Sequence, residues 1–145
     1  MSRQTILITG ASSGLGKGMA IEYAKQGKHL ALCARRMGNL QSLKASIEAD
    51  YPEARVSIKS LDVNDHDAVF RVFQEFKAEL GQLDRIIINA GMGKGASLGK
   101  GYSHANVATA QTNFVAAVVQ AEAAMEIFRQ QHAGHLVTIS SISAL

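Results

Sequence analysis

The sequence contains one cysteine, one proline and no tryptophan among its 145 residues, and its formal net charge is only +3. Cys33 therefore cannot form an intrachain disulfide, and the apolar run around it indicates a small buried hydrophobic residue. No apolar run approaches the ~20 residues of a membrane-spanning helix, and no charged segment followed by an apolar one opens the chain. The basic residues are scattered, which gives no footprint for nucleic acid. We expect a cytoplasmic protein with no membrane or nucleic-acid partner.

What the sequence does contain is enough apolar residues for one packed domain. Its hydrophobic content is 47% and its charged content 19%, which is ordinary for a globular protein. A chain of ~150 residues buries roughly 70% of its unfolded surface, so we expect residues 1–145 to form a single domain. The five histidines show no spacing typical of a metal site, and we predict none.

Short apolar runs alternate with helical patterns along the whole chain, with no hairpin signal between them. This alternation predicts an α/β fold with a parallel sheet of right-handed βαβ units. We expect a Rossmann-like, doubly wound sheet with strand order 3-2-1-4-5 and a ligand crevice at the carboxyl ends of the first and fourth strands. The expected strands are residues 6–9, 29–34, 56–63, 83–89 and 135–140.

Two helices are specified in more detail. Asn64 is a suitable N-cap for a helix with an apolar stripe, and Gly81 should end that helix. A long helix is expected from about residue 103 to 131, closed by Gly134. Its predicted apolar positions include Val107, Phe114, Val118, Met125 and Phe128.

The first expected strand runs into a glycine-rich turn and then a helix. Glycine lets the backbone approach a pyrophosphate, and a helix N-terminus offers unpaired N–H groups and partial positive charge. The spacing is neither G-x-G-x-x-G nor a P-loop, and a tight turn without a ligand is the alternative interpretation. We predict that the turn residues contact a cofactor, namely Gly10, Ser12, Ser13, Gly14, Leu15 and Gly16.

The segment Thr9-Gly10-x-x-x-Gly14-x-Gly16 resembles the T-G-x-x-x-G-x-G signature of the short-chain dehydrogenases/reductases. Further segments of that family follow in its order and spacing over essentially the whole chain: Asp62-Val63, Asn89-Ala90-Gly91, Asn113 and Ser141. Ile88 replaces the first residue of the family's N-N-A-G segment. The resemblance implies an oxidoreductase that transfers hydride between a nicotinamide cofactor and a small carbonyl or alcohol substrate.

The end of the second expected strand indicates which cofactor is used. An NAD enzyme needs an acidic side chain there for the ribose 2′-hydroxyl, and this chain has Ala34 followed by Arg35 and Arg36. Guanidinium groups suit a 2′-phosphate, so we predict NADP(H). A solvated basic loop is the alternative. The basic residue that NADP-preferring members often carry before the second glycine is Ser13 here.

The resemblance also implies roles for the later cofactor-binding residues. Asp62 would accept a hydrogen bond from the adenine amino group with help from the Val63 backbone, although a turn or cap acid is the alternative. Asn89 would support the central sheet, while the small Ala90 and Gly91 would leave room for the cofactor ribose.

Two residues are implied in catalysis. Asn113 would hold a water of the proton relay, and an exposed polar helix residue is the alternative interpretation. Ser141, with Ser140 in reserve, would bind the substrate oxygen.

The family's Tyr-x-x-x-Lys pair is missing, because Tyr23, Tyr51 and Tyr102 are not followed by lysine four residues later. We therefore expect an N-terminal portion, without the C-terminal strands and helices, of an enzyme that is a homo-oligomer at full length. The alternative is a non-catalytic nucleotide-binding module.

Overall fold

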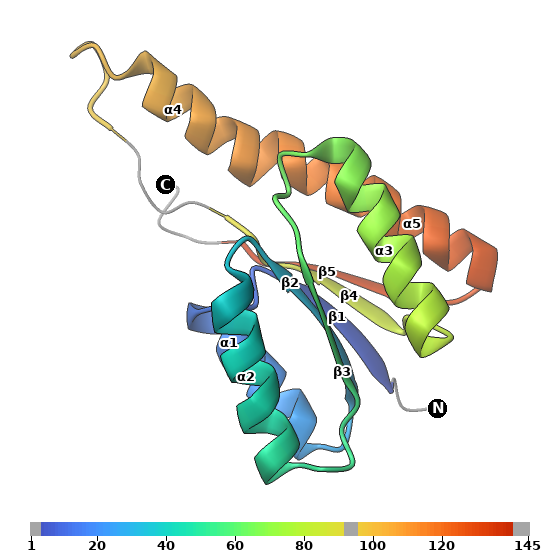
Figure 1. Ribbon diagram of the computed structural model, residues 1–145. Helices are drawn as coiled ribbons and strands as arrows, with labels where there is room; N and C mark the ends of the chain where they lie inside the picture. Colours follow the sequence, from blue (N-terminus) through green and yellow to red (C-terminus); the bar gives the residue numbers. More distant parts are fainter. Residues whose placement is uncertain (1–3, 92–95, 141–145) are drawn as a thin grey trace.

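A single parallel sheet forms the centre of the computed structural model, which describes residues 4–91 and 96–140 (Figure 1). Its strand order is β3-β2-β1-β4-β5, and every neighbouring pair is parallel, which confirms the predicted Rossmann-like topology. The strands are β1 (Thr5–Thr9), β2 (His29–Ala34), β3 (Val56–Ser60), β4 (Arg85–Ile88) and β5 (His135–Thr138).

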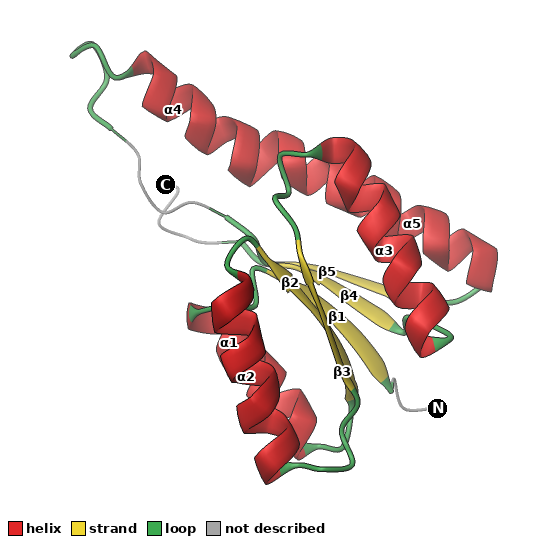
Figure 2. Ribbon diagram, in the orientation of Figure 1, coloured by secondary structure: helices red, strands yellow, loops and turns green. Residues whose placement is uncertain are grey.

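Helices cover both faces of the sheet (Figure 2). They are α1 (Gly14–Lys25), α2 (Met37–Asp50), α3 (His66–Leu80), α4 (Ser103–Ala110) and α5 (Ala116–Gln131), with a π-helical segment, η1 (Gln111–Val115), between the last two. α1 and α2 lie on one face, and α3 and α5 lie on the other.

Strand β1 shows how the sequence builds two cores. All five of its residues are buried. Ile6 and Ile8 pack in the cluster that contains α1 and α2, whereas Leu7 packs in the cluster of α3 and α5. Successive side chains of a strand point to opposite faces, so a continuous apolar run suits a strand covered on both sides.

The start of α3 differs from the prediction. Its N-cap is Asp65, whose carboxylate Oδ1 accepts a hydrogen bond from the Ala68 amide at 3.2 Å, so the prediction of Asn64 was wrong by one residue. Asparagine and aspartate are comparable N-caps, and neighbouring candidates cannot be ranked from sequence. β3 ends at Ser60, so residues 61–64 form a loop rather than the end of a strand. Gly81 ends α3 as expected.

The long helix differs more. It is not continuous α-helix, because η1 interrupts it, and His132 in the left-handed conformation ends it. Of the five predicted apolar positions, only Phe128 is buried, and the other four are exposed: Val107, Phe114, Val118 and Met125. The buried face of α5 consists of Ala116, Gln120, Ala123, Ala124, Ile127 and Phe128. The helix carries two apolar stripes, and its period alone does not say which one meets the sheet.

Candidate functional site

A cavity of about 220 Å³ opens at the carboxyl ends of β1, β2 and β4, beside the loop that follows β3. Ten of the thirteen predicted cofactor-binding residues line this cavity: Gly10, Ser12, Ser13, Arg35, Arg36, Asp62, Val63, Asn89, Ala90 and Gly91. They come from four loops that are far apart in the sequence. The remaining three, Gly14, Leu15 and Gly16, are not among the residues that line it.

The glycines of the β1–α1 turn have different surroundings. A Cβ on Gly10 would lie 2.8 Å from Cα of Ala90, and a Cβ on Gly16 would overlap the carbonyl oxygen of Gly10. Both contacts are closer than side chains tolerate, so these glycines let the turn close onto the end of β4. Gly14 has a φ of +56° and nothing within 4 Å of the added Cβ, so its surroundings are open.

Asn89 ties the end of β4 to the end of β1. Its side-chain Nδ2 donates to the carbonyl oxygens of Thr9 and Gly10, both at 3.2 Å. The hydroxyl of Thr9 accepts from the amides of Asn89 at 3.0 Å and Ala90 at 3.1 Å. These bonds support the sheet-bracing role predicted for Asn89, and they also satisfy the buried Thr9.

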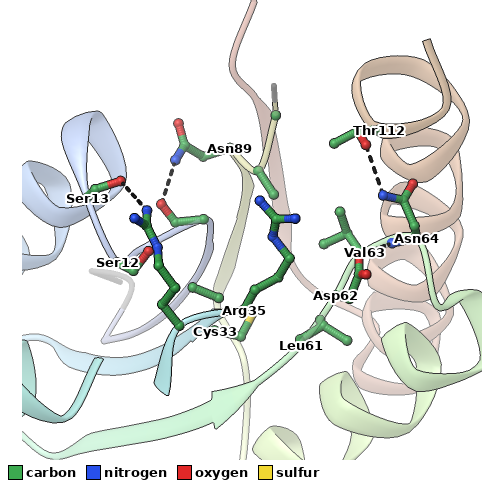
Figure 3. Close-up of a pocket in the computed structure, with 15 residues that line it drawn as sticks. Ser12, Ser13, Cys33, Arg35, Leu61, Asp62, Val63, Asn64, Asn89 and Thr112 are labelled. Atoms are coloured by element: carbon green, nitrogen blue, oxygen red, sulfur yellow. Dashed lines mark hydrogen bonds between the residues drawn. The ribbon is translucent and has the colours of Figure 1, made fainter. Parts of the chain in front are cut away.

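The two arginines after β2 give the cavity a positive wall. Figure 3 shows Arg35 reaching between Ser13 and Asn89 on one side and Asp62 and Val63 on the other. Arg36 donates from Nη2 to Oγ of Ser13 at 3.3 Å. Ser13 is the N-cap of α1, but its side chain does not cap that helix, and no acidic residue occupies the first turn. Two guanidinium groups therefore lie near the positive end of a helix dipole, which favours an anion.

The loop after β3 forms the opposite wall. The Asp62 carboxylate Oδ1 accepts from the Asn64 amide at 3.0 Å, and its carbonyl oxygen accepts from the Asp65 amide at 2.9 Å. The Asp62 side chain is therefore held at the rim by a hydrogen-bonded turn. In this position it can accept a further hydrogen bond from a ligand, since a carboxylate has more than one acceptor site.

Five further residues line the cavity that sequence reasoning had not assigned to cofactor binding: Cys33, Ala34, Leu61, Asn64 and Thr112. Four of them lie at the end of β2 or beside the Asp62-Val63 pair, which was a usable signal. Thr112 precedes Asn113, although nothing in the sequence indicated that it would be buried.

Burial raises the pKa of the Cys33 thiol to about 12, so this cysteine stays protonated and is not a nucleophile at neutral pH.

Asn113, one of the two predicted catalytic residues, is not among the residues that line this cavity. Asn113 is exposed in η1, and its Oδ1 lies 3.0 Å from the place that a Cβ on Gly91 would occupy. Its side chain is therefore packed beside the last cavity residue of the β4 loop. Ser141 lies outside the described residues. Among the residues that the structure does describe, no group of three His, Cys, Asp or Glu side chains could hold a metal ion.

The short chain dehydrogenase family profile matches residues 4–145. An uncharacterized oxidoreductase of Mycobacterium tuberculosis is 56% identical over 142 residues, which cover 98% of this chain and 56% of that protein. The NADPH-dependent reductase BacG of Bacillus subtilis is 30% identical over 139 residues, covering 96% of this chain and 54% of BacG. The chain thus spans a little over half the length of these curated relatives.

Solved structures agree with these sequence matches. The NADPH-dependent 3-quinuclidinone reductase from Rhodotorula rubra superimposes with a TM-score of 0.89 and 27% identity, over 97% of this chain and 53% of that one. A short-chain type dehydrogenase/reductase from Mycobacterium ulcerans gives a TM-score of 0.92 and 25% identity, over 99% of this chain and 54% of that one. No helix in the described ranges 4–91 and 96–140 is long and apolar enough to cross a membrane. The sequence profile and the shared topology establish that the chain belongs to the short-chain dehydrogenase/reductase family of oxidoreductases.

Proposed function

We propose that the chain binds NADP(H) in the cavity, and that the whole protein uses it to transfer hydride between nicotinamide and a small carbonyl or alcohol substrate. The observation that carries the proposal is the convergence of the glycine turn, Arg35, Arg36 and Asp62 on one cavity at the carboxyl edge of the sheet. We also propose that residues 1–145 act as one binding domain.

The donors around the cavity fit the parts of this cofactor. Arg35 and Arg36 would hold the 2′-phosphate, and the amides at the start of α1 would hold the pyrophosphate. Asp62 would accept from the adenine amino group. Gly10 packs directly on the Ala90 backbone, where a Cβ would not fit, so no side chain of the turn fills this part of the cavity. The bound cofactor would supply the hydride, while the protein supplies binding and orientation.

Ala34 supports NADP(H) over NAD(H). The end of β2 lacks the acidic side chain that would bind a free 2′-hydroxyl and repel a 2′-phosphate. Two relatives named above are described as NADPH-dependent, BacG at 30% identity and the quinuclidinone reductase at 27%. Asn113 would hold a water in the proton relay, and Ser141 would bind the substrate oxygen.

The test is to titrate NADP⁺ and NAD⁺ against the wild-type chain, Arg35→Ala and Arg129→Ala. Losing a charge-assisted phosphate contact should weaken NADP⁺ binding by about 1.5–3 kcal/mol, or roughly 10- to 150-fold, without a matching loss for NAD⁺. Arg129 is exposed in the last turn of α5 and is the matched control. Equal affinities of the wild type for the two cofactors would contradict the preference.

The glycine turn is tested by Gly14→Val. If the cofactor approaches the backbone there, this variant should lose cofactor binding while its circular dichroism stays nearly native. Gly18→Val is the control, because Gly18 is also exposed in α1 with nothing within 4 Å of an added Cβ. Unchanged binding in Gly14→Val would place the site elsewhere.

We propose that the 145-residue chain alone binds the adenosine half of NADP(H) but does not catalyse hydride transfer. A positioned general acid contributes ~10²–10⁴-fold in rate, and none of the three tyrosines is followed by a lysine four residues later. NADPH oxidation with a panel of ketones and aldehydes checks this, and turnover at ordinary enzyme rates would refute it. A non-catalytic nucleotide-binding module remains the alternative for the whole protein. The assay repeated with that protein decides between them, since a module would bind NADPH without oxidising it.

We further propose that the whole protein is a homo-oligomer located in the cytoplasm. The exposed apolar side chains of α4, η1 and α5 support self-association, because Val107, Phe114 and Val118 are 58%, 71% and 48% exposed. Light scattering after size-exclusion chromatography measures the oligomeric state, and a monomer at micromolar concentration would contradict the first part.

A further inference from the structure

The long helix is held at the cavity by few contacts. In the described part of the chain α4 has no buried residue, and Figure 1 shows it extending away from the sheet. Thr112 in η1 is the first residue of this helix to be buried, with an exposed fraction of 6%. It is also the residue of η1 that lines the cavity. Any contact that Thr112 makes therefore bears directly on where η1 lies.

Thr112 is bonded to the opposite wall of the cavity. Nδ2 of Asn64 donates to Oγ1 of Thr112 at 2.9 Å, and the dashed line in Figure 3 joins the two side chains. The two residues are 48 positions apart in the sequence. Asn64 is itself fixed, because its amide donates to the Asp62 carboxylate and the next residue caps α3. The Asn64–Thr112 bond thus connects the hydrogen-bonded loop after β3 to the helix.

The segment on the far side of this bond is a π-helix. A π-helical turn inserts an extra residue into an α-helix and is often found at functional sites. Here it places Asn113 beside Gly91, with Asn113 Oδ1 3.0 Å from a Cβ position on that glycine. A continuous set of contacts therefore runs from Asp62 through Asn64 to Thr112, the residue next to Asn113.

We propose that the Asn64–Thr112 hydrogen bond fixes the π-helical turn, so that these two residues are positioning residues for Asn113. Occupation of the adenosine end of the cavity, at Asp62, then changes the environment of Asn113, which is not among the residues that line the cavity. This inference rests on the proposed function for the identity of the ligand. The positioning itself concerns the ligand-free protein as well.

The first experiment measures amide hydrogen exchange across residues 111–116 in the ligand-free chain. Thr112→Val keeps the shape of the side chain and removes the acceptor, and it should speed exchange in this segment about fivefold, the loss expected for one hydrogen bond. Thr112→Ser restores the hydroxyl and should return the rate to within about twofold of wild type. Thr109→Val is the matched control, because the Thr109 hydroxyl bonds within the same helix to the Ala105 carbonyl.

The donor side gives an independent variant. Asn64→Ala removes the donor from an exposed loop and should speed exchange by the same factor, even if Thr112→Val loosens the whole domain. The double variant Asn64→Ala/Thr112→Val should show about fivefold rather than twenty-five-fold acceleration, because both changes remove one bond. Exchange in α1 reports global loosening. Wild-type rates in either single variant, or multiplied effects in the double one, would overturn the proposal.

The second experiment adds adenosine 2′,5′-bisphosphate, which has no nicotinamide, and follows the side-chain amide signal of Asn113 by nuclear magnetic resonance. The signal should shift in wild type and Thr112→Ser, and the shift should be lost in Thr112→Val. An equal shift in Thr112→Val would overturn the coupling. If the wild type binds neither NADP⁺ nor the bisphosphate, the proposed function is contradicted. The exchange rates of the ligand-free chain would still decide the positioning role.

Discussion

The β1–α1 turn and the long helix meet the cavity from opposite sides and are held in place by different means. The turn is held by close backbone packing, since Gly10 and Gly16 leave no room for a Cβ beside Ala90 and the Gly10 carbonyl, and by the Asn89 side chain, which donates to the Gly10 carbonyl. The helix is held by side chains on one face, starting at Thr112 and continuing along α5. The proposed phosphate end is therefore preorganised by main-chain packing. The Asn113 end depends on a few side-chain contacts, which substitutions can remove one at a time.

The largest expected effect sharpens the contrast within the helix itself. Phe128 is 6% exposed and Phe114 is 71% exposed, although both lie on the same long helix. Phe128→Ala should lower the free energy of unfolding by about 4 kcal/mol, because it removes a buried ring and leaves a cavity. Phe114→Ala should change it by less than about 0.5 kcal/mol. Urea unfolding followed by circular dichroism measures both, and equal losses would show that the exposed face is buried in solution.

The second prediction concerns the turn. Gly16→Ala should destabilise the fold by about 3 kcal/mol, since its Cβ would overlap the Gly10 carbonyl and force the turn away from β4. Gly14→Ala should cost about 1 kcal/mol, because only its φ of +56° is unfavourable for a residue with a Cβ. The same urea titrations test this pair. A larger loss of stability for Gly14→Ala than for Gly16→Ala would mean that the main-chain conformation, not close packing, makes glycine necessary in this turn.

A smaller effect is expected in the core under the helix. Gln120 is fully buried, and its Nε2 donates to the Ala116 carbonyl at 3.1 Å. Its Oε1 has no hydrogen-bond partner within the part of the chain that the structure describes. Gln120→Met keeps the length and removes the unpaired acceptor, so the free energy of unfolding should rise by about 1–2 kcal/mol. Gln41→Met, at an exposed position of α2, is the control. A loss of stability in Gln120→Met would show that the amide has a partner that matters.

The smallest effect lies at the sheet edge, far from the cavity. Hydrogen bonds from Lys59, then from Ser57, lower the pKa of the Glu79 carboxyl, and Glu79 raises the pKa of Lys59. A lowered carboxyl pKa stabilises the fold at pH values above the ordinary pKa of glutamate. This contribution is lost as the pH falls through the lowered pKa. Both side chains are partly exposed, so Glu79→Gln should cost only about 0.5 kcal/mol at pH 7 and nothing near pH 2.5. A cost that persists at low pH would indicate packing rather than charge.

The sequence was sufficient for the fold and for most of the cavity. Most strands are short apolar runs, and β3 alternates Val56 and Ile58 with Ser57 and Lys59. These patterns set the element order, and the βαβ rules then leave few topologies. The cavity residues Arg35, Asp62 and Asn89 were found because each lies at the end of a strand: Arg35 and Asn89 directly follow β2 and β4, and Asp62 comes two residues after β3. In a parallel sheet these positions meet at one edge.

Other features could not be predicted because they depend on which surfaces meet. The long helix has an exposed stripe of large apolar residues and a second stripe rich in alanine, and the second stripe, with Ala116, Ala123 and Ala124, packs in the core. Gly14 and Gly16 look alike in the motif, yet one is open and the other is closed by backbone. The bond between Asn64 and Thr112 joins residues 48 apart, and no local pattern encodes it.

The burial of Cys33 makes its rate of reaction with a thiol reagent a measure of opening of the sheet. This is the one thiol in the sequence, and it lies fully buried in β2, between β1 and β3. Cys33 borders the cavity but has no exposed surface, so a thiol reagent reaches it only when this part of the sheet opens, and the labelling rate in the native state reports how readily that opening occurs. A ligand that binds the closed form should slow labelling by the factor 1 + [L]/Kd. The affinity of any nucleotide for the cavity can then be read from one untagged cysteine, without a substrate or a coupled assay.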